Sequence, residues 1–256
     1  MILTVDALCF DRGKRSILKE ISFQAKPGEL TVILGPNGVG KTTLLKCLNR
    51  TLEPTDGTVR LGTSCASKMT PRQLARQMAY VAQQGEVADI SAFDAILLGR
   101  KPHMGIRPGA EDLAKVDAVI THLGLENLSL TSLTRMSGGE FQKVCIARAL
   151  AQETAVLLMD EPTASLDLKN EMQILRLVRH IVEDHRMTAV MTMHDLNAAL
   201  RYGHRFVFLK GGELYATGSM ESMTPEMIAG VYGVDVDIVY HNGLPLVVPR
   251  TDLHAA

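Results

Sequence analysis

The sequence predicts an α/β fold in which a mostly parallel sheet is covered by helices on both faces. Two observations support this prediction. Short apolar runs that suit buried strands alternate with stretches in which apolar residues recur at helical spacing; the runs lie at 30–34, 156–160, 188–193 and 206–209. The first run leads directly into a glycine-rich turn and a second apolar stretch, which is the strand–turn–helix order of phosphate-binding domains. With 256 residues, the chain can bury the core that this fold requires.

The composition excludes several classes of protein. The 27 basic and 28 acidic residues leave a formal net charge of -1, which gives no field that would attract nucleic acid or an anionic membrane surface. No apolar run approaches the ~20 residues of a membrane span, and the N-terminus lacks the basic stretch and cleavage site of a signal peptide. We therefore expect a cytoplasmic protein with no nucleic-acid partner and no membrane span of its own. The four cysteines lie far apart with no C-x-x-C pair, which predicts reduced, mostly buried thiols: Cys9, Cys47, Cys65 and Cys145.

The N-terminal part predicts a small antiparallel sheet beside the glycine-rich turn. Residues 2–10 alternate loosely between apolar and polar side chains, and 17–23 form a second strand candidate. A third candidate, 58–61, follows a Pro/Asp/Gly turn. The pair Thr70-Pro71 then opens a short helix, because a threonine cap followed by proline is a preferred helix start, and 79–82 forms a strand that ends at two glutamines.

Helical spacing predominates between about residues 86 and 152. The segment 91–94 is a capping box that starts one helix, and the apolar residues of 113–123 recur at helical spacing before a terminating glycine. Because strand–helix alternation resumes afterwards, we interpret 86–152 as a helical insertion into one α/β domain made of 1–85 and 153–256.

The C-terminal part continues the alternation. After the strand at 156–160 we expect a long helix near 169–183, a strand at 188–193, a short helix at 196–202 and a strand at 206–209. A hairpin turn at Gly211-Gly212, a helix that begins at Thr224-Pro225 and a last strand around 234–240 follow.

The glycine-rich turn Gly35–Thr43 fits the phosphate-binding pattern G-x-x-x-x-G-K-[ST]. Its glycines let the backbone curl so that several N–H groups face an anion, Lys41 reaches the terminal phosphates, and the Thr42 hydroxyl holds Mg²⁺. A glycine-rich turn that binds nothing is the alternative, and the Lys-Thr pair between a strand and a helix argues against it. We predict a nucleoside triphosphate site with Mg²⁺, contacted by Asn37, Gly38, Gly40, Lys41, Thr42 and Thr43.

Two carboxylates end the strand at 156–160. Asp160 emerges at the carboxyl edge of the sheet, where ligands bind in open α/β folds, and can bind Mg²⁺ there. Glu161 points differently and is suited to orient or deprotonate an attacking water. The alternative is a pair of acids that cap the next helix; Pro162 directly after them, together with the phosphate loop, disfavours it.

A second anion site is predicted at Ser137-Gly138-Gly139, which opens a helix over 141–150. The turn offers a hydroxyl, free N–H groups and the positive end of the helix dipole. Alone it is weak evidence, because such a turn usually only starts a helix. In combination with the phosphate loop and the Asp160-Glu161 pair, it indicates a second phosphate contact.

These motifs together resemble the ATPase subunit of ABC transporters over nearly the whole chain. The phosphate loop resembles the family's Walker A motif, and 156–160 resembles Walker B with Glu161 at the position of the catalytic glutamate. The remaining matches are the signature L-S-G-G-Q at Met136–Glu140, the Q-loop glutamine at Gln83 (with Gln84 as the less favoured register), the D-loop at Ser165–Asp167, and the switch histidine at His194. A lone histidine at a strand end is more often structural, but here the other motifs reverse that expectation.

The resemblance implies a P-loop NTPase fold with a RecA-like, mostly parallel core, a small antiparallel β subdomain and an inserted helical subdomain. It also implies that two copies pack head to tail. ATP on one phosphate loop then meets Ser137, Gly138 and Gly139 of the other copy, with Asp167 nearby. Gln83 is expected to join the shell of Mg²⁺ and the γ-phosphate and to sense a membrane partner, and His194 to hold the γ-phosphate and position the water.

The sequence departs from the family pattern at two places. Glu140 replaces the last glutamine of the signature; because an acid is tolerated at a helix N-terminus, we expect it to face the helix or solvent. The residue that stacks on the base is the second departure. The family's aromatic position falls on Arg12, with Phe10 two residues before it, and either side chain can stack on adenine.

Three segments resemble the ATPases of siderophore, haem and cobalamin importers: Leu98–His103, 194–202 and 231–234. An ordinary surface loop is the alternative for the first. The resemblance implies the ATP-hydrolysing motor of a metal-chelate importer, peripheral on the inner face of the cell membrane, which docks on a permease through the Gln83 region and the Leu98–His103 loop. The cargo belongs to the permease and its binding protein, so this chain does not choose among the three chelates.

Two other classes of protein are alternatives to the importer subunit. A soluble ABC ATPase that acts as an assembly or regulatory scaffold is the alternative, and the importer-like loop disfavours it. A small GTPase or kinase with a phosphate loop is disfavoured too, because such proteins lack the Ser-Gly-Gly signature and no Asn-Lys-x-Asp run occurs here.

Overall fold

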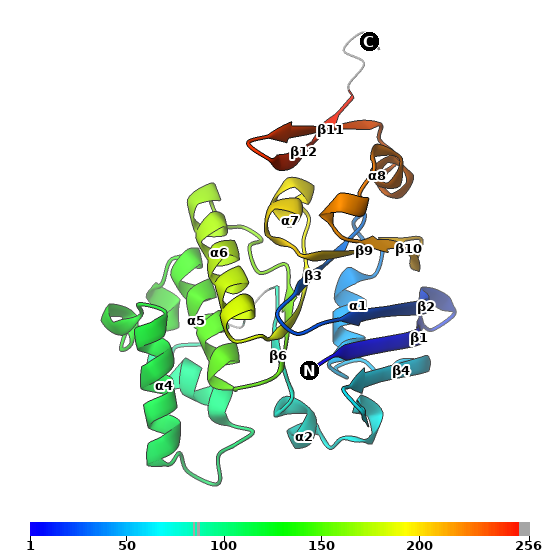
Figure 1. Ribbon diagram of the computed structural model, residues 1–256. Helices are drawn as coiled ribbons and strands as arrows, with labels where there is room; N and C mark the ends of the chain where they lie inside the picture. Colours follow the sequence, from blue (N-terminus) through cyan, green and yellow to red (C-terminus); the bar gives the residue numbers. More distant parts are fainter. Residues whose placement is uncertain (84, 86–87, 251–256) are drawn as a thin grey trace.

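The computed structural model describes residues 1–83, 85 and 88–250 (Figure 1). The alternative Q-loop residue, Gln84, lies outside the described residues. The chain folds around a six-stranded sheet with the order β10-β9-β3-β8-β7-β6. Five of these strands run parallel and β10 is antiparallel to β9, as the alternation of strands and helices predicts. The strands are β3 (Leu30–Leu34), β6 (Met78–Val81), β7 (Val156–Asp160), β8 (Thr188–Thr192), β9 (Arg205–Lys210) and β10 (Glu213–Gly218).

Each face of this sheet buries its own core. Strands β3, β7 and β8 are buried at every residue, so alternate side chains enter opposite cores. On one face lie the long helices that follow the strands; on the other lie α1 and a second, antiparallel sheet (Figure 1). The covering helices are α1 (Lys41–Leu48), α5 (Gly138–Ala151), α6 (Leu168–Asp184) and α7 (Leu196–Tyr202). This three-layer arrangement is the α/β fold predicted from the sequence.

The predicted antiparallel sheet is also present, with the order β2-β1-β4-β5. Its strands are β1 (Leu3–Arg12), β2 (Arg15–Ala25), β4 (Asp56–Leu61) and β5 (Ser64–Cys65). The pairing of β1 with β2 shifts register near Leu8 and again around Phe10, so the simple inside–outside alternation fails at the end of β1. These bulges decide which side chains reach the phosphate loop.

Short local signals start the helices as predicted. The side chain of Thr70 accepts a hydrogen bond from the Gln73 N–H and caps α2 (Pro71–Ala75). Ser91 caps α3 (Ala92–Leu97) in the same way through the Asp94 N–H. α4 (Ala110–His122) and α5 belong to the segment predicted as a helical insertion, and they lie beside the β6 end of the sheet (Figure 1). Short 3-10 turns link these elements at Ala66–Lys68, Leu98–Arg100 (η2), Glu126–Leu128, Leu133–Arg135 and Met220–Ser222.

The C-terminal segment contains one hairpin more than the sequence predicts. The β9–β10 turn falls at Gly211-Gly212, and α8 (Pro225–Tyr232) begins after Thr224, both as expected. The last predicted strand is β11 (Val236–His241), but it pairs with a further strand, β12 (Leu244–Pro249). Asn197 joins this hairpin to α7. Its side-chain oxygen accepts from the backbone N–H of Val247 at 2.7 Å, and its side-chain nitrogen donates to the Val247 carbonyl at 3.3 Å.

All four thiols are free, in agreement with the absence of a disulfide pattern. Cys47 and Cys145 are buried, whereas Cys9 and Cys65 are partly exposed, so the expectation of mostly buried thiols holds for two of the four. No helix among the described residues is long and apolar enough to cross a bilayer.

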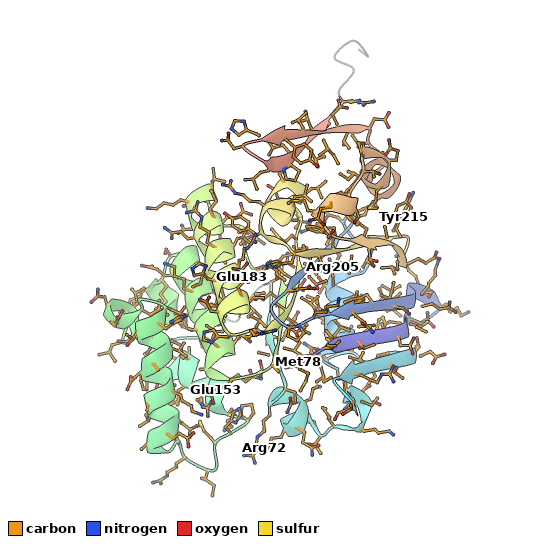
Figure 2. All side chains as sticks on the ribbon, viewed as in Figure 1. Arg72, Met78, Glu153, Glu183, Arg205 and Tyr215 are labelled. Carbon is orange, nitrogen blue, oxygen red and sulfur yellow. The ribbon has the colours of Figure 1, made fainter. Side chains whose placement is uncertain are left out.

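The segment Leu98–His103 is less exposed than a docking loop needs to be. Arg100 is only 2% exposed, and its guanidinium donates to Ala151 O at 2.8 Å, to Glu153 at 2.7 Å and to Asp112 at 3.1 Å. The expectation that Arg100 faces a partner is therefore wrong. Its guanidinium instead holds η2 to the start of α4 and to the end of α5. Glu153 is labelled near the lower ends of these helices in Figure 2, where it also pairs with Lys115 of α4.

The rest of this segment is also held in place. The His103 ring lies 2.9 Å from Gln152 O, and Arg72 of α2 donates to the carbonyls of Pro102 and Met104 at 2.8 Å each (Figure 2). Leu98, 53% exposed, and Lys101 are the members that face solvent.

Arg100→Ala is expected to lower the free energy of unfolding by about 2–3 kcal/mol, because it leaves Asp112 and the Ala151 carbonyl without their buried donor. Urea unfolding measures the change. Lys101→Ala, an exposed neighbour, is the matched control and should stay near the wild-type value. Equal stability of the two variants would show that the Arg100 contacts contribute nothing measurable.

Candidate functional site: a nucleotide phosphate pocket

The predicted phosphate loop connects β3 to α1 in a conformation that depends on its glycines. Gly38 and Gly40 have φ of 76° and 110°, in the region that side chains disfavour, and a Cβ on Gly35 would lie 2.4 Å from Leu209 O. No side chain caps α1, whose N-cap is Gly40. The first N–H groups of the helix therefore remain available, and an oxyanion is the ligand that a bare helix N-terminus attracts.

Lys41 lies in the middle of this loop. Its side chain is 5% exposed, and the ammonium donates to the carbonyls of Gly35 at 2.9 Å and Pro36 at 3.4 Å. Burial lowers the pKa of Lys41, while the negative charges of Glu161 and Asp160 act in the opposite direction. The loop thus presents a cation close to two carboxylates at the point where a phosphate chain would lie.

Asp160 is bound by hydroxyl groups from two neighbouring strands and a helix. Its Oδ1 accepts from Thr192 at 2.7 Å and from Thr42 at 3.1 Å, and its Oδ2 accepts from Tyr80 at 3.3 Å. The contact with Thr192 follows from sheet register, because Asp160 and Thr192 are direct partners in the β7–β8 ladder. Asp160 is 1% exposed, so these contacts fix its orientation.

Thr42 and Asp160 fit a magnesium ion. Mg²⁺ prefers hard oxygen ligands, and in nucleotide sites it takes one or two from the protein and the rest from phosphates and water. The hydroxyl and carboxylate oxygens of these two residues lie side by side, 3.1 Å apart. Within the described part of the chain, no group of three or more His, Cys, Asp and Glu side chains could hold a metal on its own.

Glu161 is the centre of a second set of contacts. Its carboxylate Oε2 accepts from Gln83 Nε2 at 2.6 Å and lies 2.5 Å from His194 Nε2, while its backbone N–H donates to Thr192 at 2.9 Å. Glu161 has a φ of 47°, which is uncommon for a residue with a long side chain and costs energy. Three residues that the sequence placed far apart, Gln83, Glu161 and His194, therefore meet at one carboxylate that can accept a proton.

These groups surround one open cavity of about 550 Å³. Its lining contains all six predicted phosphate-loop residues together with Gln83, Glu161 and His194; Arg12, Arg15 and Ile17 complete it. A cavity of this size suits a small-molecule ligand. The structure thus brings together ten of the residues singled out in the sequence for nucleotide chemistry, Arg12 included.

The two candidates for the base-stacking residue are separated by the structure. Arg12 is exposed and lines the cavity. Phe10 is 8% exposed and belongs to the core between the two sheets, so its assignment to the adenine site is wrong. The register shifts around Phe10 turn its ring inward and leave Arg12 at the rim. Arg15, across the β1–β2 turn, also lines the cavity and was not singled out from the sequence.

The Ser137-Gly138-Gly139 turn does not line this cavity. Ser137 caps α5, and Glu140 completes a reciprocal cap, because its carboxylate accepts from the Ser137 N–H at 2.9 Å and from the hydroxyl at 2.7 Å. Glu140 therefore faces its own helix, as predicted, and these hydrogen bonds from Ser137 lower its pKa. Asp167 is likewise a cap, accepting from the Asn170 N–H at 2.8 Å at the start of α6.

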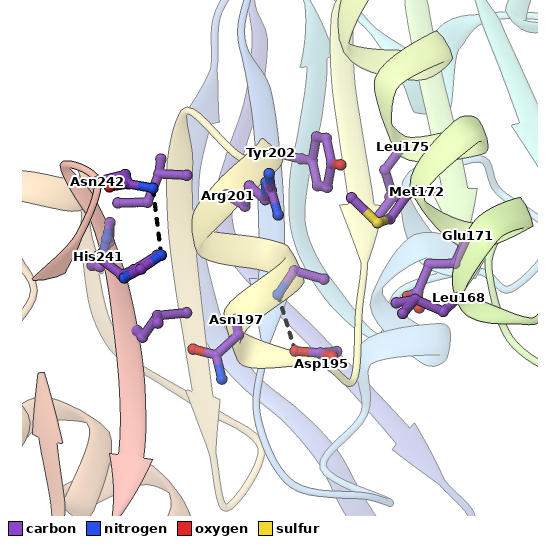
Figure 3. A pocket seen from close by; sticks show the side chains of 14 residues that line it. Leu168, Glu171, Met172, Leu175, Asp195, Asn197, Arg201, Tyr202, His241 and Asn242 are labelled. Carbon is purple, nitrogen blue, oxygen red and sulfur yellow. Dashed lines mark hydrogen bonds between the residues drawn. The ribbon is translucent and has the colours of Figure 1, made fainter. Parts of the chain in front are cut away.

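A different cavity, of about 410 Å³, lies between α6, α7 and the tip of the β11–β12 hairpin (Figure 3). Leu168 and Asp195, the residues that follow Asp167 and His194, line it together with His241 and Asn242 of the hairpin. Asp195 accepts from the Ala198 N–H at 2.9 Å. No residue of the phosphate loop lines this cavity, so the triphosphate site remains the one beside Lys41.

The geometry defines a nucleotide site of the phosphate-loop class, and comparison with protein families identifies it further. The model of the ABC transporter family matches residues 18–164. The chain belongs to this family.

Two relatives match over almost the whole chain. It is 44% identical to the uncharacterized ABC transporter ATP-binding protein MJ0089 of Methanocaldococcus jannaschii, over 97% of this chain and 98% of that protein. It is 34% identical to the ferric enterobactin transport ATP-binding protein FepC of Escherichia coli, over 95% and 92% of the two chains.

Solved structures agree with this assignment. A structure described as an inward-facing metal-chelate type ABC transporter superposes with a TM-score of 0.85 at 25% identity and covers 97% of both chains. The dimeric ATP-binding cassette MJ0796, bound to ADP and Pi after hydrolysis, superposes with a TM-score of 0.74 at 27% identity, covering 86% of this chain and all of that one.

Thr192 is the contact that the sequence did not reveal. It links the Asp160 carboxylate to the backbone of Glu161, since its hydroxyl donates to Asp160 and accepts from the Glu161 N–H. Nothing local marks it, because its role depends on the register between residues 32 apart in the chain; the only signal is a threonine ending the strand before His194.

Thr192→Val is expected to slow nucleotide hydrolysis about tenfold, because the Asp160 carboxylate and the Glu161 backbone N–H each lose a hydrogen bond while the side-chain volume stays about the same. Steady-state phosphate release measures this. Thr31→Val is the matched control: Thr31 is as fully buried in the same sheet, and its hydroxyl has no partner among the described residues. Similar rates in the two variants would show that the Thr192 contacts do not support hydrolysis.

Proposed function

We propose that this protein is the ATP-hydrolysing subunit of an ABC importer for metal chelates. The observation that carries the proposal is the convergence of Lys41, the Thr42–Asp160 pair and Glu161 on one cavity. The relatives support the transport of chelates, because FepC is named for ferric enterobactin and a structure that covers 97% of both chains is of a metal-chelate type transporter. They favour transport over a scaffold role.

The residues of the cavity divide the work of hydrolysis. The free N–H groups of α1 and the ammonium of Lys41 bind the triphosphate, with Thr42 and Asp160 holding Mg²⁺. When bound, Mg²⁺ neutralises phosphate charge and polarises the bond to be broken. Glu161 orients the attacking water and takes its proton, once it exchanges its contacts with Gln83 and His194 for that water. Those two residues then face the γ-phosphate, and Arg12 lies beside the base.

A second copy of the chain completes this site. The cavity is open, and Ser137 to Gly139, a loop able to bind phosphate, lies outside it. In a head-to-tail dimer the loop of one copy covers the nucleotide of the other, with Asp167 close to the interface. The dimeric cassette MJ0796 supports such an arrangement.

A permease docks in a groove on the side of the molecule that carries α1 and α2. The groove has a volume of about 550 Å³ and lies between the segment after α1 (residues 49–53), α2, β6, η2 and the end of α5. Apolar side chains such as Leu74, Met78 and Leu98 share it with the charged Arg50 and Arg148. A short cytoplasmic helix of an integral membrane protein suits this mixed lining. The subunit therefore works on the cytoplasmic face of the membrane without spanning it.

Glu161→Gln is expected to reduce ATP hydrolysis at least about 100-fold, because the amide cannot take a proton, while ATP stays bound between two subunits. Light scattering after size exclusion then detects a dimer with ATP and a monomer without it. Near-normal turnover would remove Glu161 from the catalytic role.

Adding Ser137→Arg to the Glu161→Gln variant separates binding from dimer closure. Ser137 lies outside the cavity of its own subunit, so calorimetry should show unchanged ATP affinity while the ATP-dependent dimer disappears. Equal loss of ATP binding and dimer would place the Ser137 loop in the site of its own subunit.

Leu98→Glu is expected to abolish the stimulation of ATPase activity by the permease while basal activity and folding remain. Leu98 is exposed and lines the groove, and a charge there opposes an apolar contact. Lys101→Glu is the matched control, since Lys101 is exposed but does not line the groove. Full stimulation of Leu98→Glu in reconstituted vesicles would place the permease elsewhere.

A further inference from the structure

Tyr80 extends from the docking groove to the magnesium carboxylate. Its side chain lines the groove, together with Leu74, Met78 and Leu98. Its hydroxyl donates to Asp160 Oδ2 at 3.3 Å. Burial and the nearby charge of Asp160 raise the pKa of Tyr80, so the hydroxyl stays protonated and acts as a donor. The aromatic ring of Tyr80 therefore spans the distance between the groove and the Asp160 carboxylate.

The position of Tyr80 follows from the register of the sheet. Tyr80 pairs with Leu158 in the parallel β6–β7 ladder, and Asp160 is two residues further along β7. Residues two apart on a strand point to the same face, and long side chains lean along the strand, so the hydroxyl reaches the next residue on that face. Tyr80 and Leu158 both belong to the core on the α1 side of the sheet.

The two oxygens of Asp160 have different partners. Oδ1 accepts from Thr42 and Thr192, which belong to the phosphate site itself. Oδ2 accepts from Tyr80, the one of its three donors that also lines the groove. A group that packs against the exposed part of this ring therefore touches the same side chain that donates to Oδ2. Mutation of a residue that orients a metal ligand typically lowers metal affinity or activity 10–100-fold.

We infer that Tyr80 is a positioning residue that couples occupancy of the groove to the magnesium carboxylate Asp160. The inference rests on the proposed function for the occupant of the groove, a cytoplasmic segment of the permease. It is distinct from the role expected of Gln83, which contacts Glu161 rather than Asp160. Movement of the ring by the permease segment changes the hold on Asp160, and with it the affinity for the Mg²⁺–ATP complex.

The first test uses the subunit without a permease. Calorimetric titration of ATP with and without Mg²⁺ gives the increase in ATP affinity that the metal supplies. In Tyr80→Phe, which keeps the ring and removes the hydroxyl, this increase should be about tenfold smaller than in the wild type. Tyr202→Phe is the matched control, because the Tyr202 hydroxyl is buried without a partner among the described residues. If Mg²⁺ raises the ATP affinity of Tyr80→Phe as much as that of Tyr202→Phe, Tyr80 does not orient Asp160 for metal binding.

The second test uses the reconstituted complex with its permease. Tyr80→Phe should still copurify with the permease but lose most of the stimulation of ATPase activity, whereas Tyr202→Phe keeps it. A Tyr80→Phe variant that is fully stimulated would overturn the coupling. If the wild-type subunit neither binds nor responds to the permease, the proposed function fails instead, and the calorimetric result still decides the contact between Tyr80 and Asp160.

Discussion

The structure depends on the common register of three buried parallel strands. Ile33, Thr192 and Asp160 are aligned across β3, β8 and β7, so the chain segments that follow these strands begin at one edge of the sheet. Glu161 follows Asp160 directly, and the phosphate loop and His194 begin two residues after Ile33 and Thr192. Backbone pairing alone therefore gathers groups that are more than a hundred residues apart, and the side-chain hydrogen bonds only refine the arrangement.

Features that depend on a few neighbouring residues could be predicted from the sequence. The phosphate loop, the caps at Thr70 and Ser91 and the Gly211-Gly212 turn are set by local geometry, and all lie where the pattern indicated. Features that depend on strand pairing could not. Phe10 is buried and Arg12 lines the cavity because of bulges in β1. The role of Thr192 depends on its pairing with Asp160 in β7.

Burial of a charged residue was equally hidden from sequence reasoning. The segment at 98–103 is polar and rich in basic residues, which normally indicates solvent exposure. Arg100 is buried because two acids and a carbonyl from distant elements converge on it. A family resemblance in such a segment can therefore reflect the needs of packing as well as those of a partner.

The contacts of Arg100 also determine how force passes through the molecule. They join η2, the start of α4 and the end of α5 through one buried guanidinium. Arg148 and Gln152 at the C-terminal end of α5 line the groove, whereas Ser137 caps its other end. With 14 residues, α5 is about 21 Å long. A rotation imposed at the groove would therefore be carried along α5 to the Ser137 loop at its far end.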